Sequence, residues 1–207
     1  MGIYNYIQSM QHEFSKAIVL RSLFLKDKQK MLSLFSERFG LISLVIKGCS
    51  SPIKGTLSEP FCEAEFFFTK GNSDIRNYQD GSIIDLHLSL RNKLIYLKTA
   101  SSMTNAFLTF QLPEKASPHL YALLSSFLKQ IPQFLFQDTL LACFYLKFLR
   151  HEGLYHKECE LASLSLSSQQ NLAKIAYLQS FDELKKEEIS PSLFSYVETL
   201  FFKTLKD

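Results

Sequence analysis

The first part of the chain alternates between apolar and polar residues. Residues 16–21, 31–38 and 41–48 are typical of three successive strands, and a charged loop at residues 26–29 and the turn Phe39-Gly40 join them. Residues 63–66 alternate in the same way, and residues 83–86 end the section. Turn chemistry occurs at residues 70–74 and at Asp80-Gly81, and residues 48–61 look like an irregular connection. This pattern predicts about five strands between residues 16 and 88, as in a five-stranded Greek-key barrel.

The second part of the chain has the helical period. Apolar residues recur at a spacing of three and four in residues 119–131, 140–149 and 193–205. Ser190-Pro191 supplies an N-cap and a first-turn proline for the last of these helices. The Ser/Leu-rich residues 163–168 fit neither period. The change of period predicts an α+β protein with an N-terminal β-barrel domain at residues 1–88 and an all-helical domain at residues 89–207.

Charge is concentrated in the predicted barrel. The 207 residues carry a net charge of +3, but residues 15–54 alone contain eight Lys/Arg and two Asp/Glu, a net +6. A basic segment on a nearly neutral body indicates a directed electrostatic surface, although charged strand ends that only aid solubility would give the same pattern.

Lysines near the predicted loops are the candidates for nucleic-acid phosphate contacts. Those loops flank the binding face of such barrels. The candidate cations are Lys26, Lys28, Lys30, Lys47, Lys54, Lys70 and Arg76. Aromatic residues on the same strands could stack on bases, and Phe24, Phe66, Phe68 and Tyr78 have suitable positions. The alternative for each ring is a place in the hydrophobic core.

Metal binding and catalysis are the weaker interpretations. Cys143, His151, His156 and Cys159 could supply four ligands, but the cysteines lack the paired spacing typical of zinc sites. We therefore expect no metal, no cofactor and free thiols. The sequence contains no catalytic or phosphate-binding motif. It also contains no secretory signal and no apolar stretch long enough to cross a membrane, which predicts a cytoplasmic protein.

These elements together resemble the RecO family of DNA repair and recombination mediators. The resemblance rests on residues 16–21, the turn Phe39-Gly40 with residues 41–48, residues 66–71, and the helical segments at 120–131 and 146–155. It implies an OB-fold followed by a helical domain. It also implies a non-enzymatic protein that binds single- and double-stranded DNA and anneals complementary strands. Its expected partners are the C-terminal tail of the single-strand binding protein and RecR, with which it would load the recombinase.

Two segments depart from the family pattern. Cys159 occupies the first position of a Cys-x-x-Cys pair, but Ala162 occupies the second and the later pair is missing, so family-type zinc binding is not expected. The loop that is often arginine-rich in the family is here residues 49–54, with Lys54 as its one cation.

The expected partner site lies on the helix at residues 140–150. By the resemblance, Lys147 and Arg150 would receive the carboxylate of the acidic, Phe-ended tail beside an apolar pocket. Both cations could instead complement the helix dipole. A helical protein-interaction scaffold without DNA contact is the alternative function. Ionic strength would distinguish the two functions, since phosphate binding weakens steeply with salt.

Overall fold

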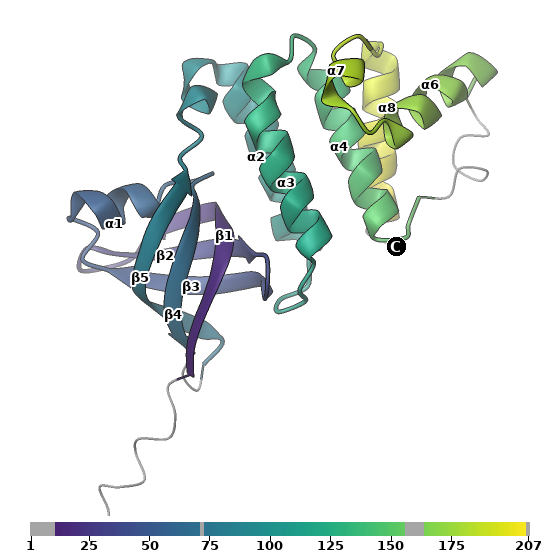
Figure 1. The fold of residues 1–207 in the computed structure, drawn as a ribbon. Helices are drawn as coiled ribbons and strands as arrows, with labels where there is room; N and C mark the ends of the chain where they lie inside the picture. The colour runs from purple at the N-terminus through teal and green to yellow at the C-terminus, as the bar shows by residue number, and fades with distance from the viewer. Residues whose placement is uncertain (1–10, 71–72, 156–163, 206–207) are drawn as a thin grey trace, which may run out of the picture. The chain divides into compact units, whose positions relative to one another are not determined.

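The structure, a computed structural model, describes residues 11–70, 73–155 and 164–205. Five strands close into a barrel: β1 (Gln11–Phe24), β2 (Gln29–Ser36), β3 (Gly40–Lys47), β4 (Glu63–Lys70) and β5 (Ile75–Asp85) (Figure 1). Their order around the barrel is β1-β2-β3-β5-β4. The β3–β5 pair is parallel and the other neighbours are antiparallel. This five-stranded arrangement confirms the predicted OB-like barrel.

Alternate side chains along the strands point inward and fill the interior of the barrel. Every second residue of β3 is buried, namely Ile42, Leu44 and Ile46, whereas Leu41, Ser43 and Val45 lie on the outer side and are half-buried. The inward residues of β1, β2, β3 and β4 form one apolar cluster, which also contains Leu57 and Cys62, and Tyr78 of β5 packs against it. The period of two in the sequence therefore reflects one buried face per strand.

Two segments of the barrel differ from the prediction. The connection after β3, expected to be irregular, contains the short helix α1 (Pro52–Leu57), which starts at a proline in its first turn. It lies at one end of the barrel and contributes Leu57 to the core (Figure 1). Asp80-Gly81, expected to be a turn, lies inside the continuous strand β5. The strand continues through this pair, with a register shift between Phe67 and Phe68 of β4.

The rest of the described chain is helical, which confirms the predicted second region. Its helices are α2 (Leu94–Phe110), α3 (Pro118–Gln130), α4 (Gln137–His151), α6 (Leu166–Tyr177), α7 (Phe181–Leu184) and α8 (Pro191–Thr204). Short 3-10 turns cover Leu88–Asn92 and Ile131–Gln133. The described part of the serine-rich stretch, residues 164–168, leads into α6, where the Ser165 hydroxyl accepts a hydrogen bond from the Ser168 amide. No helix in the described ranges is long and apolar enough to cross a membrane.

The chain packs as two compact units. The barrel unit consists of the described residues up to His87 together with Thr104–Ser125, and the helical unit consists of Leu88–Met103 and the described residues from Ser126 onward. Within the barrel unit the Phe107 ring meets the Phe35 ring edge-on, with 4.4 Å between centroids. Pro113 forms a bridge with Leu41 of β3. Each unit is thus built from two separate stretches of the chain. The predicted domain boundary at residue 88 stays a prediction.

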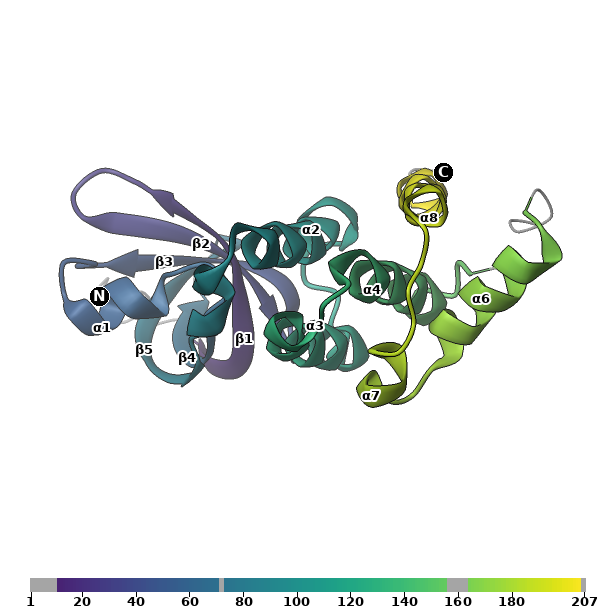
Figure 2. The ribbon, with the colours of Figure 1, turned by 90° about the horizontal axis from the view of Figure 1, so that it is seen from above.

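Helix α4 forms the centre of the helical unit. It is buried on nearly all sides, and Figure 2 shows it beside α6 and α8. The Tyr145 ring stacks on the Phe201 ring of α8 with 4.1 Å between centroids, and Phe148 meets the same Phe201 ring edge-on. The wide apolar stripe in the sequence therefore belongs to a core helix.

Candidate nucleic-acid interface

The loop between β1 and β2 carries two exposed lysines. Lys26 and Lys28 are exposed, and no ion pair involves them among the described residues. Asp27 and Lys28 both adopt left-handed backbone conformations, with φ of 59° and 58°. This conformation is uncommon for a residue other than glycine, and uncommon conformations cluster at functional sites. The loop thus presents two cations on a defined backbone.

Two more lysines lie at the same end of the barrel. Lys47, the last residue of β3, is exposed and pairs in register with Gln29, the first residue of β2. The Lys54 ammonium donates to the Lys47 carbonyl at 3.3 Å. The Cys49 amide donates to the Lys28 carbonyl at 3.0 Å, which ties the two loops together. We call Lys26, Lys28, Lys47 and Lys54 the basic rim.

Lys30 has a different role from its neighbours. Its side chain is buried, and the ammonium donates to the Ser58 hydroxyl at 2.8 Å and pairs with Glu59 at 3.4 Å. The same ammonium lies 4.8 Å from the centre of the Phe24 ring. These contacts hold β2 against the segment that follows α1. Lys30 therefore stabilises the fold next to the basic rim and is not itself a surface cation.

The aromatic candidates separate by burial. Phe66 and Phe68 belong to the barrel core, the alternative given for each ring, so they are not available to stack on bases. Tyr78 is half-buried, with the Lys54 ammonium 5.8 Å from its ring centre. Phe24 is 79% exposed at the end of β1, directly before the lysine loop. Of the two rings near the basic rim, Phe24 is therefore the exposed one.

Lys70 and Arg76 lie away from the rim. Lys70 pairs with the first residue of β1, whereas the lysine loop follows the last residue of that strand. Lys70 and Arg76 both bind the Glu114 carboxylate, at 2.9 and 3.0 Å, and Arg76 also pairs with Glu13 at 3.4 Å. The hydrogen bond from Lys70, with the charge of Arg76, lowers the pKa of Glu114 below its ordinary value. Both cations thus hold the segment after α2 against the barrel.

The two cations predicted for partner binding hold α6 in place. Within the helical unit, the Lys147 ammonium donates to the Leu178 carbonyl and the Arg150 guanidinium donates to the Ala176 carbonyl, each at 2.6 Å. Arg150 also lies 4.0 Å from the centre of the Tyr177 ring. These bonds satisfy carbonyls at the C-terminal end of α6. A carboxylate that approached Lys147 or Arg150 would have to compete with them.

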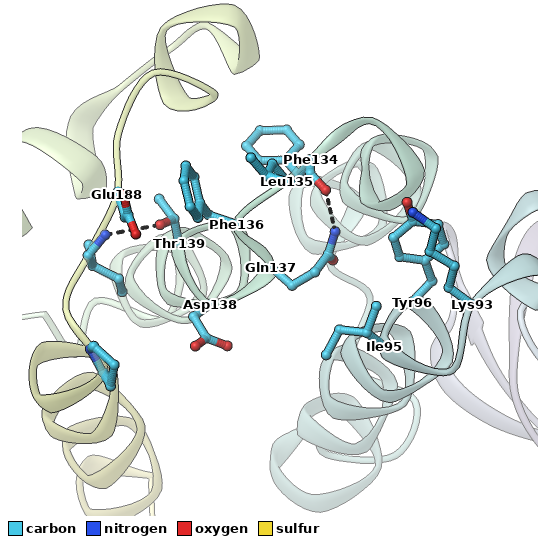
Figure 3. Close-up of a pocket in the computed structure, with 12 residues that line it drawn as sticks. Lys93, Ile95, Tyr96, Phe134, Leu135, Phe136, Gln137, Asp138, Thr139 and Glu188 are labelled. Atoms are coloured by element: carbon cyan, nitrogen blue, oxygen red, sulfur yellow. Dashed lines mark hydrogen bonds between the residues drawn. The ribbon is translucent and has the colours of Figure 1, made fainter.

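A cavity in the helical unit combines an apolar wall with polar groups (Figure 3). Its volume is about 370 Å³. Ile95, Phe134, Leu135 and Ile189 supply apolar surface, and Lys93 supplies a cation. The first turn of α4 borders the cavity without a side-chain cap on its amides, although Asp138 lies in that turn. Sequence reasoning missed this cavity because its residues come from three separate segments.

The proposed ligands for a metal are only partly described. Cys143 is buried, and burial raises the pKa of its thiol to about 12. The thiol contacts the Ile175 carbonyl at 3.4 Å. His156 and Cys159 lie outside the described residues, as does Ala162. Within the described ranges no group of His, Cys, Asp and Glu is arranged to hold a metal ion, and Cys49, Cys62 and Cys143 are free.

Comparison with known proteins identifies the barrel. Residues 10–87 match the family model described as the N-terminal domain of recombination protein O. This range covers all five strands of the barrel described above. The barrel thus matches the N-terminal domain of the RecO family. The basic rim therefore lies within the range that matches a RecO N-terminal domain.

Curated RecO relatives extend the similarity into the helices. The chain is similar to "DNA repair protein RecO" of Chlamydia trachomatis serovar L2, with 30% identity over 151 residues, 69% of this chain and 60% of the relative. It is 26% identical to the protein of that name from Caldicellulosiruptor saccharolyticus over 162 residues, which are 73% of this chain and 64% of the relative. The chain thus spans about 60% of the length of the curated relatives that it matches.

Proposed function

We propose that this chain binds single-stranded DNA without sequence preference through the basic rim and Phe24, and that it acts in DNA repair and recombination. The observation that carries the proposal is the gathering of four lysines and one exposed aromatic ring at one end of a RecO-type barrel. Lysines that contact a nucleic acid neutralise its phosphates and release condensed counterions. An exposed ring beside them stacks on any base, because every base has a π-face.

The same geometry supports strand annealing. Contacts to phosphates and to base faces leave the pairing edges of the bases free, so a second strand can pair with a strand that is already bound. Such a protein makes and breaks no covalent bond. In the role implied by the family it would bind double-stranded DNA as well, cooperate with RecR and help to load the recombinase. Chromosomal DNA as the ligand would place the protein in the cytoplasm.

The rim is tested by removing its lysines. We expect the variant Lys26→Ala/Lys28→Ala/Lys47→Ala to bind an oligothymidine more weakly at low salt. The slope of log affinity against log salt should fall by about 0.7 for each phosphate of a single strand that the variant no longer neutralises. Lys30 is left unchanged because its ammonium is part of the fold. Fluorescence anisotropy over a salt series measures both quantities.

The matched control removes three exposed lysines elsewhere, with Lys98→Ala/Lys186→Ala/Lys203→Ala. The control lowers the net charge by the same amount, so it should shift affinity only slightly. A rim variant with an intact fold and an unchanged salt slope would refute the rim as the binding site.

We also propose a site for the acidic, Phe-ended tail of the single-strand binding protein. The observation behind it is the cavity in Figure 3, where apolar residues can receive a ring while Lys93 and the uncapped α4 amides can receive a carboxylate. This site is preferred to Lys147 and Arg150, whose donors are used within the fold.

Titration with a labelled tail peptide tests the site. Lys93→Ala or Leu135→Ser should weaken binding, and Lys203→Ala should leave it unchanged. Binding that is abolished in Arg150→Ala but kept in Lys93→Ala would return the site to α4. Tail binding by a protein that fails to bind DNA would favour the scaffold function.

A further inference from the structure

Exposed phenylalanine rings occur in two places on the barrel. Of the 19 phenylalanines, Phe14, Phe24 and Phe67 are the ones that the structure leaves exposed. Phe24 belongs to the proposed DNA interface. Phe14 and Phe67 lie on a different part of the barrel surface, directly opposite each other in the register of β1 and β4.

The Phe14 and Phe67 rings form a stacked pair. Their centroids are 5.6 Å apart with an interplanar angle of 21°, and the two side chains are 49% and 44% exposed. Leaving two large rings in water forgoes the burial free energy that each could contribute to folding. An exposed pair of this kind on a folded barrel indicates a surface that contacts something else.

Arg38 lies beside this pair of rings, as Lys30 lies beside Phe24. The Arg38 guanidinium lies 5.3 Å from the Phe14 ring centre and donates to the Phe14 carbonyl at 3.1 Å. Arg38 is exposed and forms no ion pair with a described residue. Lys30 stands in the same relation to Phe24. The barrel therefore repeats one arrangement, an exposed ring with a cation beside it, near both ends of β1.

The electrostatic surroundings distinguish this surface from the basic rim. Lys16 is exposed two residues along β1, but Glu65 lies opposite it and Asp80 lies opposite Phe67. Asp80 accepts a hydrogen bond from the Gly81 amide, and Glu65 accepts one from Ser82 at 3.5 Å. With cations and carboxylates intermixed, ring stacking rather than phosphate attraction would supply most of the affinity here.

We propose that Phe14 and Phe67, with Arg38, form a second base-stacking site for the same single strand that the rim binds. This inference rests on the proposed function. The two sites lie near opposite ends of β1, and ten residues of strand separate Phe14 from Phe24, at most about 35 Å. A strand held at both sites would run along the barrel, with its phosphates attracted at the rim and unpaired bases stacked at the pair.

The test replaces the rings without removing apolar bulk. We expect Phe14→Leu/Phe67→Leu to weaken binding of an oligothymidine of about thirty nucleotides, longer than the roughly 4–16 that one such barrel covers. The expected loss is roughly five- to hundredfold. The loss should be the same at each salt concentration, because every lysine that binds a phosphate is still present. Phe14→Tyr/Phe67→Tyr should bind as the wild type does.

The controls separate this proposal from the rim and from a protein contact. Leu166→Ala removes an exposed apolar side chain of the helical unit and should change nothing. If the leucine variant binds DNA as tightly as the wild type, the proposal is wrong, whatever the rim variant does. If that variant instead alters sedimentation of the free protein and leaves DNA affinity unchanged, the pair is a contact between copies. A weakened leucine variant together with an unchanged rim variant would uphold this site and reject the rim.

Discussion

A buried carboxylate joins α3 to the barrel. Glu63, the first residue of β4, is 4% exposed. One of its oxygens accepts a hydrogen bond from the Tyr121 hydroxyl at 2.7 Å. The Ser125 hydroxyl is a second donor and lies 2.9 Å from both oxygens. Burying a carboxylate is costly unless donors replace the water that hydrated it. These hydroxyl donors therefore make the attachment of α3 to β4 specific.

Removing one donor should weaken this attachment. We expect Tyr121→Phe to lower the free energy of unfolding by about 1–3 kcal/mol, because the buried Glu63 carboxylate loses one of its hydrogen-bond donors. Urea unfolding followed by circular dichroism measures the change. Tyr177→Phe, which alters a half-exposed ring of the helical unit, is the control and should have little effect.

The same hydroxyl predicts a loss of stability in alkali. Burial and the hydrogen bond to Glu63 raise the pKa of Tyr121 above its ordinary value of 10.0. Above pH 10 the unfolded chain therefore loses a proton that the folded chain keeps, and stability falls as pH rises. Urea unfolding between about pH 8 and 11 should show this decline. The decline should be smaller in Tyr121→Phe, and an equal decline in both proteins would contradict the assignment.

For individual residues, the sequence predicts which side chains lie at the surface better than it predicts which groups they contact. The charge pattern pointed to the first loop, where Lys26 and Lys28 are exposed, and their contact with phosphates stays a prediction. It could not separate them from Lys30, because Ser58 and Glu59 lie almost thirty residues further on. Arg76 likewise meets Glu13 and Glu114, which are distant in the chain in both directions.

Among the elements, β5 depends on a close backbone approach. A Cβ at Gly81 would lie 2.8 Å from the Glu65 carbonyl oxygen and 3.3 Å from the Tyr78 ring. Gly81→Ala must therefore push β5 away from β4, and we expect a loss of about 1–3 kcal/mol in unfolding free energy, as in other overpacked sites. Thermal and urea unfolding of the variant measure the loss. Ser82→Ala, at the next and exposed position of β5, should cost much less.

Periodicity predicted most elements, but it was obscured at three short segments of the barrel. Three consecutive phenylalanines at 66–68 hide the alternation of β4, in which Phe66 and Phe68 point into the core and Phe67 is exposed. A strict period of two through this run would have identified Phe67 as a surface ring. Asp80-Gly81 has the composition of a turn, but here the glycine serves interstrand packing. The six residues of α1 are too few to show a helical period.

For the whole molecule, two periods of hydrophobicity were enough to predict the α+β class. The net charge of +6 on residues 15–54 also predicted a basic surface. Part of that charge is used internally, by Lys30 with Glu59, and part lies in the rim. The sequence could not show this division, because it depends on which strand ends meet when the barrel closes.

Thr104–Ser125 belongs to the barrel unit. The unit that packs together is therefore larger than the segment that the family model matches. The family match ends at residue 87, yet Phe35 and Glu63 are covered by Phe107 and Tyr121 beyond that point. A chain cut after His87 would leave an apolar ring and a carboxylate without their cover. We expect it to aggregate or to bind hydrophobic dyes, whereas a chain cut after Gln130 should unfold cooperatively. The family model thus covers the five strands alone, whereas autonomous folding would require the first helical hairpin as well.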